Sequence, residues 1–274
     1  LSSAASDVYK RQIVGAGVAG LTAAEVLGKR GFKPVVFEKE NVCGGQINLA
    51  DKGPKKEKIG WCVEDLEVNA RKQGADIRLG KEATAADILA LSPCAVIVAT
   101  GAVAVRPKSI KGADGKNVFT TTQILDGSVK LEGKKVAVIG TGMTGLETGE
   151  LLASMGNKLT FVEMAKEVAP GTWFQHLDDA MPKLEKAGAK FLLSTKLVAI
   201  DEKGALVENV KTKEQSRVDA DAVVLSLGAR PVNGLAKELE GKVKDLFVVG
   251  DADKVGRIAN ATAAAYDVAM NKIK

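Results

Sequence analysis

Apolar and polar positions along the chain fall into two alternating kinds of segment. Short, nearly continuous apolar runs end in glycine or an acid, as buried parallel strands do. These runs are PVVFE (34–38), CAVIVATG (94–101), KKVAVIG (134–140), KLTFVE (158–163), AVVLSLG (222–228) and DLFVVGD (245–251). Between them, helical stretches are predicted near 18–30, 144–155, 176–187 and 260–273, and EDLEVNARKQGADIRLG (64–80) predicts a helix followed by a strand. This alternation predicts an α/β protein with parallel sheets.

One strand–turn–helix pattern occurs twice, in IVGAGVAGLTAAEVL (13–27) and VAVIGTGMTGLETGE (136–150). Each copy contains G-x-G-x-x-G, formed by Gly15, Gly17 and Gly20 in the first and by Gly140, Gly142 and Gly145 in the second. Glu38 and Glu163 close the next strand, each 23 residues after the first glycine of its copy. A strand before the motif, a helix after it and an acid at this distance together indicate dinucleotide binding.

Each part of this fingerprint has its own physical reason. The first glycine permits the tight turn, the second lets the backbone approach a pyrophosphate, and the third lets the helix pack on the strand. The helix N-terminus offers N–H groups and a positive dipole end to the phosphates. The acid accepts hydrogen bonds from ribose hydroxyls and repels a 2′-phosphate. Glu163 therefore favours NADH over NADPH at the second site, although nearby Lys166 weakens that preference.

The order of the segments predicts two Rossmann-like three-layer domains. The second copy looks complete without the strand at 245–251 and the terminal helix, while the first copy lacks a final strand. We therefore expect the chain to return to the first domain at its end. The expected boundaries are 1–124 and 241–274 for a discontinuous first domain and 125–240 for an inserted second domain.

Composition excludes several classes of partner. The net charge is +5, and lysines are interspersed with acids except in KGPKKEK (52–58), which reads as a solvated loop, so we expect no nucleic-acid partner. No apolar run approaches the roughly 20 residues of a membrane span, and the first dozen residues lack the apolar core of a secretory signal. Three widely spaced cysteines argue against a disulfide framework and fit a reducing, cytoplasmic location.

The first twelve residues do not match the rest of the pattern. LSSAASDVYKRQ places YKRQ where a buried strand needs an apolar run, whereas the second copy has KKVAVIG. The segment also resembles a translated adapter sequence. We predict that residues 1–12 are not native and give them no functional role.

The combined features resemble the two-dinucleotide-binding-domain flavoproteins, the thioredoxin reductase and glutathione reductase superfamily. The resemblance rests on both fingerprints, on ATG at 99–101 and on GD at 250–251, along nearly the whole chain. More narrowly, GGQINLA (44–50), GMTGLET (142–148) and GDADKVGRIANATAAAYDVA (250–269) resemble the C-terminal half of the Old Yellow Enzyme-like NADH:flavin oxidoreductases. That group includes 2,4-dienoyl-CoA reductase, enoate reductase and trimethylamine dehydrogenase. Its upstream barrel, with FMN and an iron–sulfur cluster, has no counterpart here.

The resemblance implies FAD in the first domain and NADH, with NADPH less favoured, in the second. FAD would be held by Gly15, Gly17, Val18, Ala19, Gly20, Glu38, Lys39, Gly45, Gln46, Ala99, Thr100, Gly101, Gly250, Asp251, Ile258 and Ala259. NADH would be held by Gly140, Thr141, Gly142, Met143, Thr144, Gly145, Glu163 and Gly228. The backbone N–H groups of Ile258 and Ala259 would face the flavin ring and stabilise the negative charge of its reduced form.

The implied activity is hydride transfer from NADH to FAD, with no catalytic side chain and no metal ligand in this chain. Electrons would pass to the absent iron–sulfur and FMN barrel, where an enoate or 2,4-dienoyl-CoA type of substrate is reduced. Three alternatives stay open: a free-standing NADH-dependent flavin reductase (a diaphorase) that feeds a separate carrier, an amine dehydrogenase that works in reverse, and a non-catalytic nucleotide-binding module. The intact fingerprint with Glu163 argues against the second alternative.

For four other residues, a purely structural role competes with a functional one. His176, the only histidine, is expected in the first turn of a surface helix. Trp173 and Phe174 would cover the nicotinamide site or meet an absent domain, or else occupy a core or hinge position. Cys43 lies near GGQ without a partner at C-x4-C spacing, so we expect a packing residue rather than half of a redox dithiol.

Overall fold

The computed structural model describes residues 11–274. Their contacts divide the chain into two compact units. Unit 1 contains the described residues through Asp51, Glu57–Val103 and Arg230–Lys274, and unit 2 contains Lys52–Lys56 and Ala104–Ala229. The chain thus leaves unit 1, forms most of unit 2 and returns to unit 1.

Unit 1 is built on a parallel five-stranded sheet in the order β15-β4-β1-β2-β3. Its strands are β1 (Arg11–Val14), β2 (Val35–Phe37), β3 (Asp76–Arg78), β4 (Ala95–Val98) and β15 (Asp245–Val248). Its helices are α2 (Val18–Lys29), α3 (Ile47–Ala50), α4 (Trp61–Lys72), α5 (Ala85–Ala90), α9 (Gly234–Leu239) and α10 (Ile258–Asp267), with 3₁₀ turns at Glu57–Gly60 and Gly250–Ala252 and a π-helical turn at Val268–Lys272. The late strand β15 pairs with β4, which explains why the chain returns to this unit.

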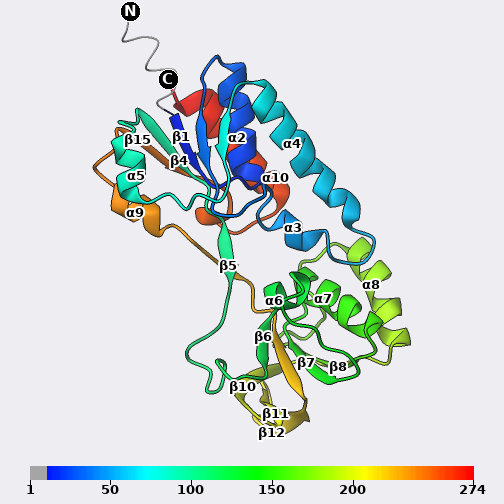
Figure 1. Ribbon diagram of the computed structural model, residues 1–274. Coiled ribbons are helices and arrows are strands. Elements are labelled where there is room, and N and C mark those ends of the chain that lie inside the picture. The colour runs from blue at the N-terminus through cyan, green and yellow to red at the C-terminus, as the bar shows by residue number, and fades with distance from the viewer. Residues whose placement is uncertain (1–10) are drawn as a thin grey trace, which may run out of the picture. The chain divides into compact units, whose positions relative to one another are not determined.

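Alternate residues of the central strand β1 serve two separate cores. Ile13 points into the core under α2, α4 and α10, while Val14 packs in the core under α5 and α9. A strand in a parallel sheet is buried on both faces, which is why these strands read as continuous apolar runs. Figure 1 shows helices on both sides of this sheet.

Unit 2 also contains a parallel five-stranded sheet, but helices cover only one face of it. Its parallel sheet has the order β6-β13-β7-β8-β9, formed by β6 (Val118–Thr120), β7 (Lys135–Ile139), β8 (Lys158–Val162), β9 (Lys190–Leu192) and β13 (Ala222–Leu225). One core lies under α7 (Met143–Ser154) and α8 (Phe174–Lys186), beside the short α6 (Thr121–Leu125). The other face packs against a three-stranded antiparallel sheet of β10 (Thr195–Asp201), β11 (Gly204–Asn209) and β12 (Gln215–Asp219), seen at the foot of Figure 1. The third layer here is a sheet.

The boundaries of the units correct the predicted ones. Unit 2 spans 104–229, whereas the sequence placed the insertion at 125–240. One strand pairing and one helix packing explain the difference. Val118–Thr120 forms β6 beside β13 and so belongs to the second sheet, and α9 (Gly234–Leu239) packs in the core of the first. The chain passes between units through the short paired strands β5 (Ala102–Ala104) and β14 (Ala229–Pro231).

The prediction about residues 1–12 falls mainly on residues 1–10, which lie outside the described residues. Arg11 and Gln12 are described, and they form the first half of β1 with side chains 8% and 1% exposed. They pair in register with Ala95 and Val96 of β4. The strand therefore forms despite two polar residues at buried positions.

Candidate dinucleotide-binding sites

The first fingerprint turns at the carboxyl end of β1, between β2 and β4. Strand order reverses at β1, and ligands of open parallel sheets bind at such a switch point. Gly15 has φ +104, and a Cβ atom built on it would lie 2.3 Å from the carbonyl oxygen of Ala99. A Cβ on Gly20 would lie 1.8 Å from the Gly15 carbonyl oxygen. These two glycines are therefore required by the fold itself.

The second glycine of each fingerprint behaves differently. A Cβ on Gly17 would have Gly44 O, at 3.9 Å, as its nearest neighbour, and a Cβ on Gly142 would meet nothing within 4 Å. Both residues are the N-caps of their helices, and neither has a positive φ. No packing demand explains glycine at these two positions. A ligand that needs the backbone bare, such as a pyrophosphate, fits this observation.

The two acids are bound to their fingerprints in the same way. Glu38 Oε2 accepts the N–H of Ala16 at 2.7 Å, and Glu163 Oε2 accepts the N–H of Thr141 at 2.9 Å. Each second carboxylate oxygen accepts a local N–H, from Glu40 for Glu38 and from Ala165 for Glu163, both at 2.9 Å. The 23-residue spacing thus places each carboxylate directly beside its glycine turn.

Further predicted residues gather around the first turn. Gln46 Nε2 donates to Asp251 Oδ2 at 3.2 Å, and a Cβ on Gly101 would lie 3.9 Å from that same nitrogen. Gly45 faces the second glycine of the turn, with 3.6 Å between its constructed Cβ and Gly17 Cα. Gln46, Asp251, Gly101, Gly45 and Gly17 therefore converge, although they come from distant parts of the sequence.

The remaining unit 1 predictions lie on surrounding elements. Ala19 is buried in the first turns of α2, and a Cβ on Gly250 would come 3.0 Å from its side chain. Ile258 and Ala259 are exposed at the start of α10, where N–H groups have no partner within the helix. Val18 begins α2, Lys39 follows β2, and Ala99 and Thr100 follow β4. The Thr100 hydroxyl donates to Val232 O.

The second turn lies at the carboxyl end of β7, between β13 and β8. A Cβ on Gly140 would lie 2.3 Å from Ser226 O, and one on Gly145 would lie 2.4 Å from Gly140 O, as in the first copy. Met143 and the exposed Thr144 begin α7, and Gly228 follows β13 with φ +80 and open space at its Cβ position. Thr141 is fully buried.

Sequence reasoning missed Gly44. It forms an isolated parallel bridge with Gly17, and its N–H donates to Ala16 O at 2.9 Å, which extends the first turn by one neighbouring backbone segment. Its φ of +119 excludes most side chains. The glycine pair in CGGQ was the available signal.

Cys43 is a packing residue, as predicted, because it is 5% exposed and packs in the core under α2. Burial, reinforced by a hydrogen bond with Glu67, raises the pKa of its thiol to about 12. A thiol with this pKa is protonated at neutral pH and is a poor nucleophile.

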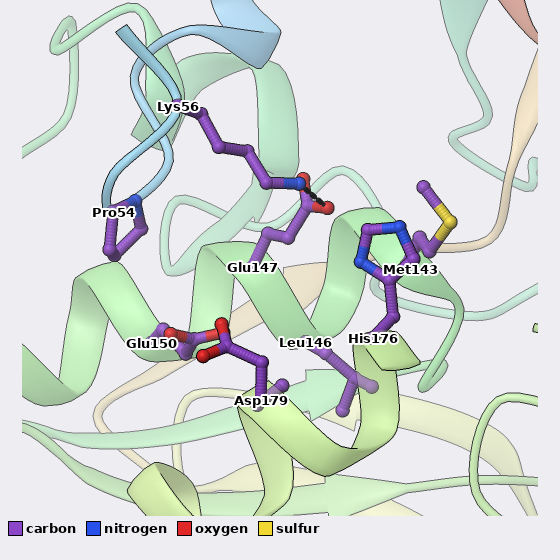
Figure 2. Close-up of a pocket in the computed structure, with 9 residues that line it drawn as sticks. Pro54, Lys56, Met143, Leu146, Glu147, Glu150, His176 and Asp179 are labelled. Atoms are coloured by element: carbon purple, nitrogen blue, oxygen red, sulfur yellow. Dashed lines mark hydrogen bonds and ion pairs between the residues drawn. The ribbon is translucent and has the colours of Figure 1, made fainter. Parts of the chain in front are cut away.

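His176 lies exposed in the first turn of α8, as predicted. Figure 2 shows it beside Met143 in a small depression, across which Lys56 forms an ion pair with Glu147. On the same helix, Lys183 pairs with Asp179 and with Glu150 of α7. Trp173 and Phe174 are 62% and 67% exposed, so the core position is wrong for both.

A family model described as pyridine nucleotide-disulphide oxidoreductase matches residues 9–266. The chain belongs to this family. Its fold is the thioredoxin reductase-like fold of two Rossmann-like domains, and thioredoxin reductase of Lactococcus lactis superposes with a TM-score of 0.74 at 19% identity over 95% of this chain and 96% of that one. The chain is accordingly an FAD-dependent oxidoreductase or a part of one, and it binds FAD and a pyridine nucleotide.

Longer relatives are more similar in sequence. An NADH oxidase of Thermoanaerobacter brockii is 38% identical, over 94% of this chain and 40% of its own length. A bilirubin reductase of Mediterraneibacter gnavus is 37% identical, over 91% and 38%. A solved 2-naphthoyl-CoA reductase superposes with a TM-score of 0.89 at 28% identity, over 97% of this chain and 40% of that one. The chain thus spans about two fifths of these relatives.

No group of His, Cys, Asp and Glu among residues 11–274 could hold a metal ion. Among the helices of that same stretch, none has both the length and the apolar character that crossing a bilayer requires.

Proposed function

We propose that this chain is the NADH-oxidising, FAD-containing module of a larger reductase. NADH binds unit 2, FAD binds unit 1, and bound FAD supplies the chemistry that accepts the hydride. The observation that carries the proposal is the bare second glycine in both fingerprints, with no neighbour of the fold closer than 3.9 Å to its Cβ position. Two such glycine turns, each beside a hydrogen-bonded acid, are what the binding of two adenine dinucleotides requires.

Each predicted residue has one task in this proposal. Backbone N–H groups at the starts of α2 and α7 bind the two pyrophosphates, and Glu38 and Glu163 accept hydrogen bonds from the two adenosine riboses. The hydrogen-bonded pair Gln46 and Asp251 orients the flavin end of FAD, together with the N–H groups that begin α10 at Ile258. The protein supplies position and electrostatics, and the cofactors supply the redox chemistry.

Glu163 makes NADH the preferred donor. Burial raises the pKa of its carboxyl, but hydrogen bonds from the Ala165 and Thr141 N–H groups and from the Thr141 hydroxyl outweigh burial and lower the pKa, so the carboxylate is ionised at neutral pH. A negative charge next to the ribose 2′ position accepts hydrogen bonds from a hydroxyl and repels a phosphate. NADH is therefore bound in preference to NADPH.

The electrons then leave this chain. We propose an iron–sulfur and FMN barrel as the acceptor, with an enoate or dienoyl-CoA type of substrate reduced there. Support comes from relatives whose remaining three fifths lie outside the matched part, and from the names cinnamate reductase and 2-naphthoyl-CoA reductase among them. Alone, the chain should reduce only dyes, quinones or oxygen.

This function is tested by steady-state reduction of ferricyanide. The FAD-loaded chain is expected to oxidise NADH at least about 10-fold more efficiently, in kcat/KM, than NADPH, because one charge repulsion near a 2′-phosphate is worth more than about 1.4 kcal/mol in a partly buried site. A crotonate-type enoate should not be reduced by the chain alone. Equal efficiency with NADPH would contradict the role of Glu163, and no activity with either nucleotide would contradict the function.

A further inference from the structure

Thr141 connects three parts of the second site. It lies between the first two glycines of the fingerprint and is 0% exposed. Its hydroxyl donates to Glu163 Oε2 at 2.8 Å and accepts the N–H of Ala169 at 2.9 Å, so the buried hydroxyl uses its donor and one acceptor position. Its backbone N–H donates to the same carboxylate oxygen. One residue thus joins the glycine turn, the acid and the segment between β8 and α8.

The first fingerprint lacks this connection. Its equivalent residue is Ala16, which offers Glu38 a backbone N–H at 2.7 Å and no side-chain donor. Glu38 is itself 7% exposed and so confined by packing, whereas Glu163 is only partly buried. The more exposed acid is therefore the one that receives the additional hydrogen bond.

Ala169 shows why the connection extends beyond Glu163. It is a non-glycine residue in the left-handed region, with φ 46, and is 1% exposed. Such a conformation persists only where surrounding contacts hold it. The hydrogen bond from Ala169 N–H to the Thr141 hydroxyl is one such contact, and it fixes the path of the segment that begins at Glu163.

We propose that Thr141 is a positioning residue for nucleotide specificity. Its hydroxyl holds the Glu163 carboxylate in the orientation that receives the ribose hydroxyls of NADH and opposes a 2′-phosphate. A carboxylate has about four acceptor positions. The N–H and hydroxyl of Thr141 and the N–H of Ala165 occupy three of them, and a backbone hydrogen bond from Met164 also reaches the group, so its rotation is fixed. This inference rests on the proposed function, in which Glu163 faces that ribose.

Thr141→Ala is the decisive variant, because Ala16 shows that the same turn accommodates alanine. Thr141→Ser keeps the hydroxyl, and Thr141→Val keeps the shape. Calorimetric titration of the FAD-loaded chain with NAD⁺ and NADP⁺ gives both dissociation constants. We expect Thr141→Ala and Thr141→Val to raise the NAD⁺ constant about 10-fold, as loss of a hydrogen bond to a charged group does. The NADP⁺ constant should barely change, and Thr141→Ser should stay within about twofold of the parent.

Two readouts separate positioning from a structural role. In a Glu163→Gln background, Thr141→Ala should add little further loss, because the hydroxyl acts through the carboxylate. The pH profile of NAD⁺ binding should also move. Burial raises the pKa of Glu163, but the N–H groups of Ala165 and Thr141 and the Thr141 hydroxyl outweigh it and lower the pKa. Binding is present above this pKa and is lost as pH falls through it, so removing the hydroxyl moves the acid limb to higher pH.

An unchanged ratio of the NAD⁺ and NADP⁺ constants in Thr141→Ala, with a lower melting temperature, would overturn the proposal and leave Thr141 a structural residue. A parent chain that binds neither nucleotide would instead reject the proposed function, and this inference with it. Full additivity of Thr141→Ala and Glu163→Gln would show that the hydroxyl does not act through the carboxylate.

Discussion

Gly17→Ala is expected to give a folded protein that no longer retains FAD. The substitution suits the backbone, because Gly17 has φ −75 and ψ −177 and its constructed Cβ lies no closer than 3.9 Å to Gly44 O. The fold therefore has room for the methyl group. The same methyl group would occupy the space of a pyrophosphate bound to the N–H groups of α2. Losing one or two hydrogen bonds to a charged group weakens binding by about 10- to 1,000-fold.

Flavin absorbance after desalting and the melting temperature without FAD provide the measurement. Gly17→Ser is the control for helix capping, because serine is a good N-cap and should still exclude FAD. Gly15→Ala is the opposite control: its Cβ would lie 2.3 Å from Ala99 O, so it should destabilise the protein with or without FAD. Normal flavin retention by Gly17→Ala would show that no phosphate contacts this turn.

Gly142→Val is expected to give a yellow protein with little response to NADH. Beyond its immediate chain neighbours, nothing lies within 4 Å of a Cβ at this position, so the fold leaves open space where a side chain would begin. The pyrophosphate of NADH would be displaced from the N-terminus of α7, and KM for NADH should rise about 100-fold or more. FAD content should equal that of the parent, because the substitution lies in unit 2.

The two glycine variants form a matched pair. Gly17→Ala should remove FAD and leave NAD⁺ titration heat largely intact, while Gly142→Val should do the reverse. Their melting temperatures without ligand should lie close to that of the parent. If Gly142→Val lost flavin and Gly17→Ala lost none, the assignment of the two cofactors to the two fingerprints would be reversed.

The sequence predicted the parts of the site that depend on local geometry. A glycine turn between a strand and a helix, with an acid at the end of the next strand, is specified within about 25 residues of chain, and in the structure both acids bind their own turns. The exposed first-turn position of His176 and the buried, unreactive Cys43 were also readable from their neighbours.

Features set by pairing between distant residues were not predictable in the same way. The domain boundary was wrong because β6 is short and pairs with β13, about a hundred residues later in the chain. The bridge from Gly44 to Gly17 and the hydrogen bond from Ala169 to Thr141 likewise join separate loops. The core position for Phe174 failed because an aromatic residue at the start of a helix carries no local signal of exposure.

An anaerobic absorbance spectrum of the FAD-loaded chain, recorded before and after one equivalent of NADH, tests the proposed hydride transfer. We expect a visible flavin absorbance band that bleaches with NADH and bleaches much more slowly with NADPH. A protein that stays colourless after incubation with FAD, or a flavin band that NADH leaves unchanged, would contradict the claim that the two fingerprints hold a donor and an acceptor of the same hydride.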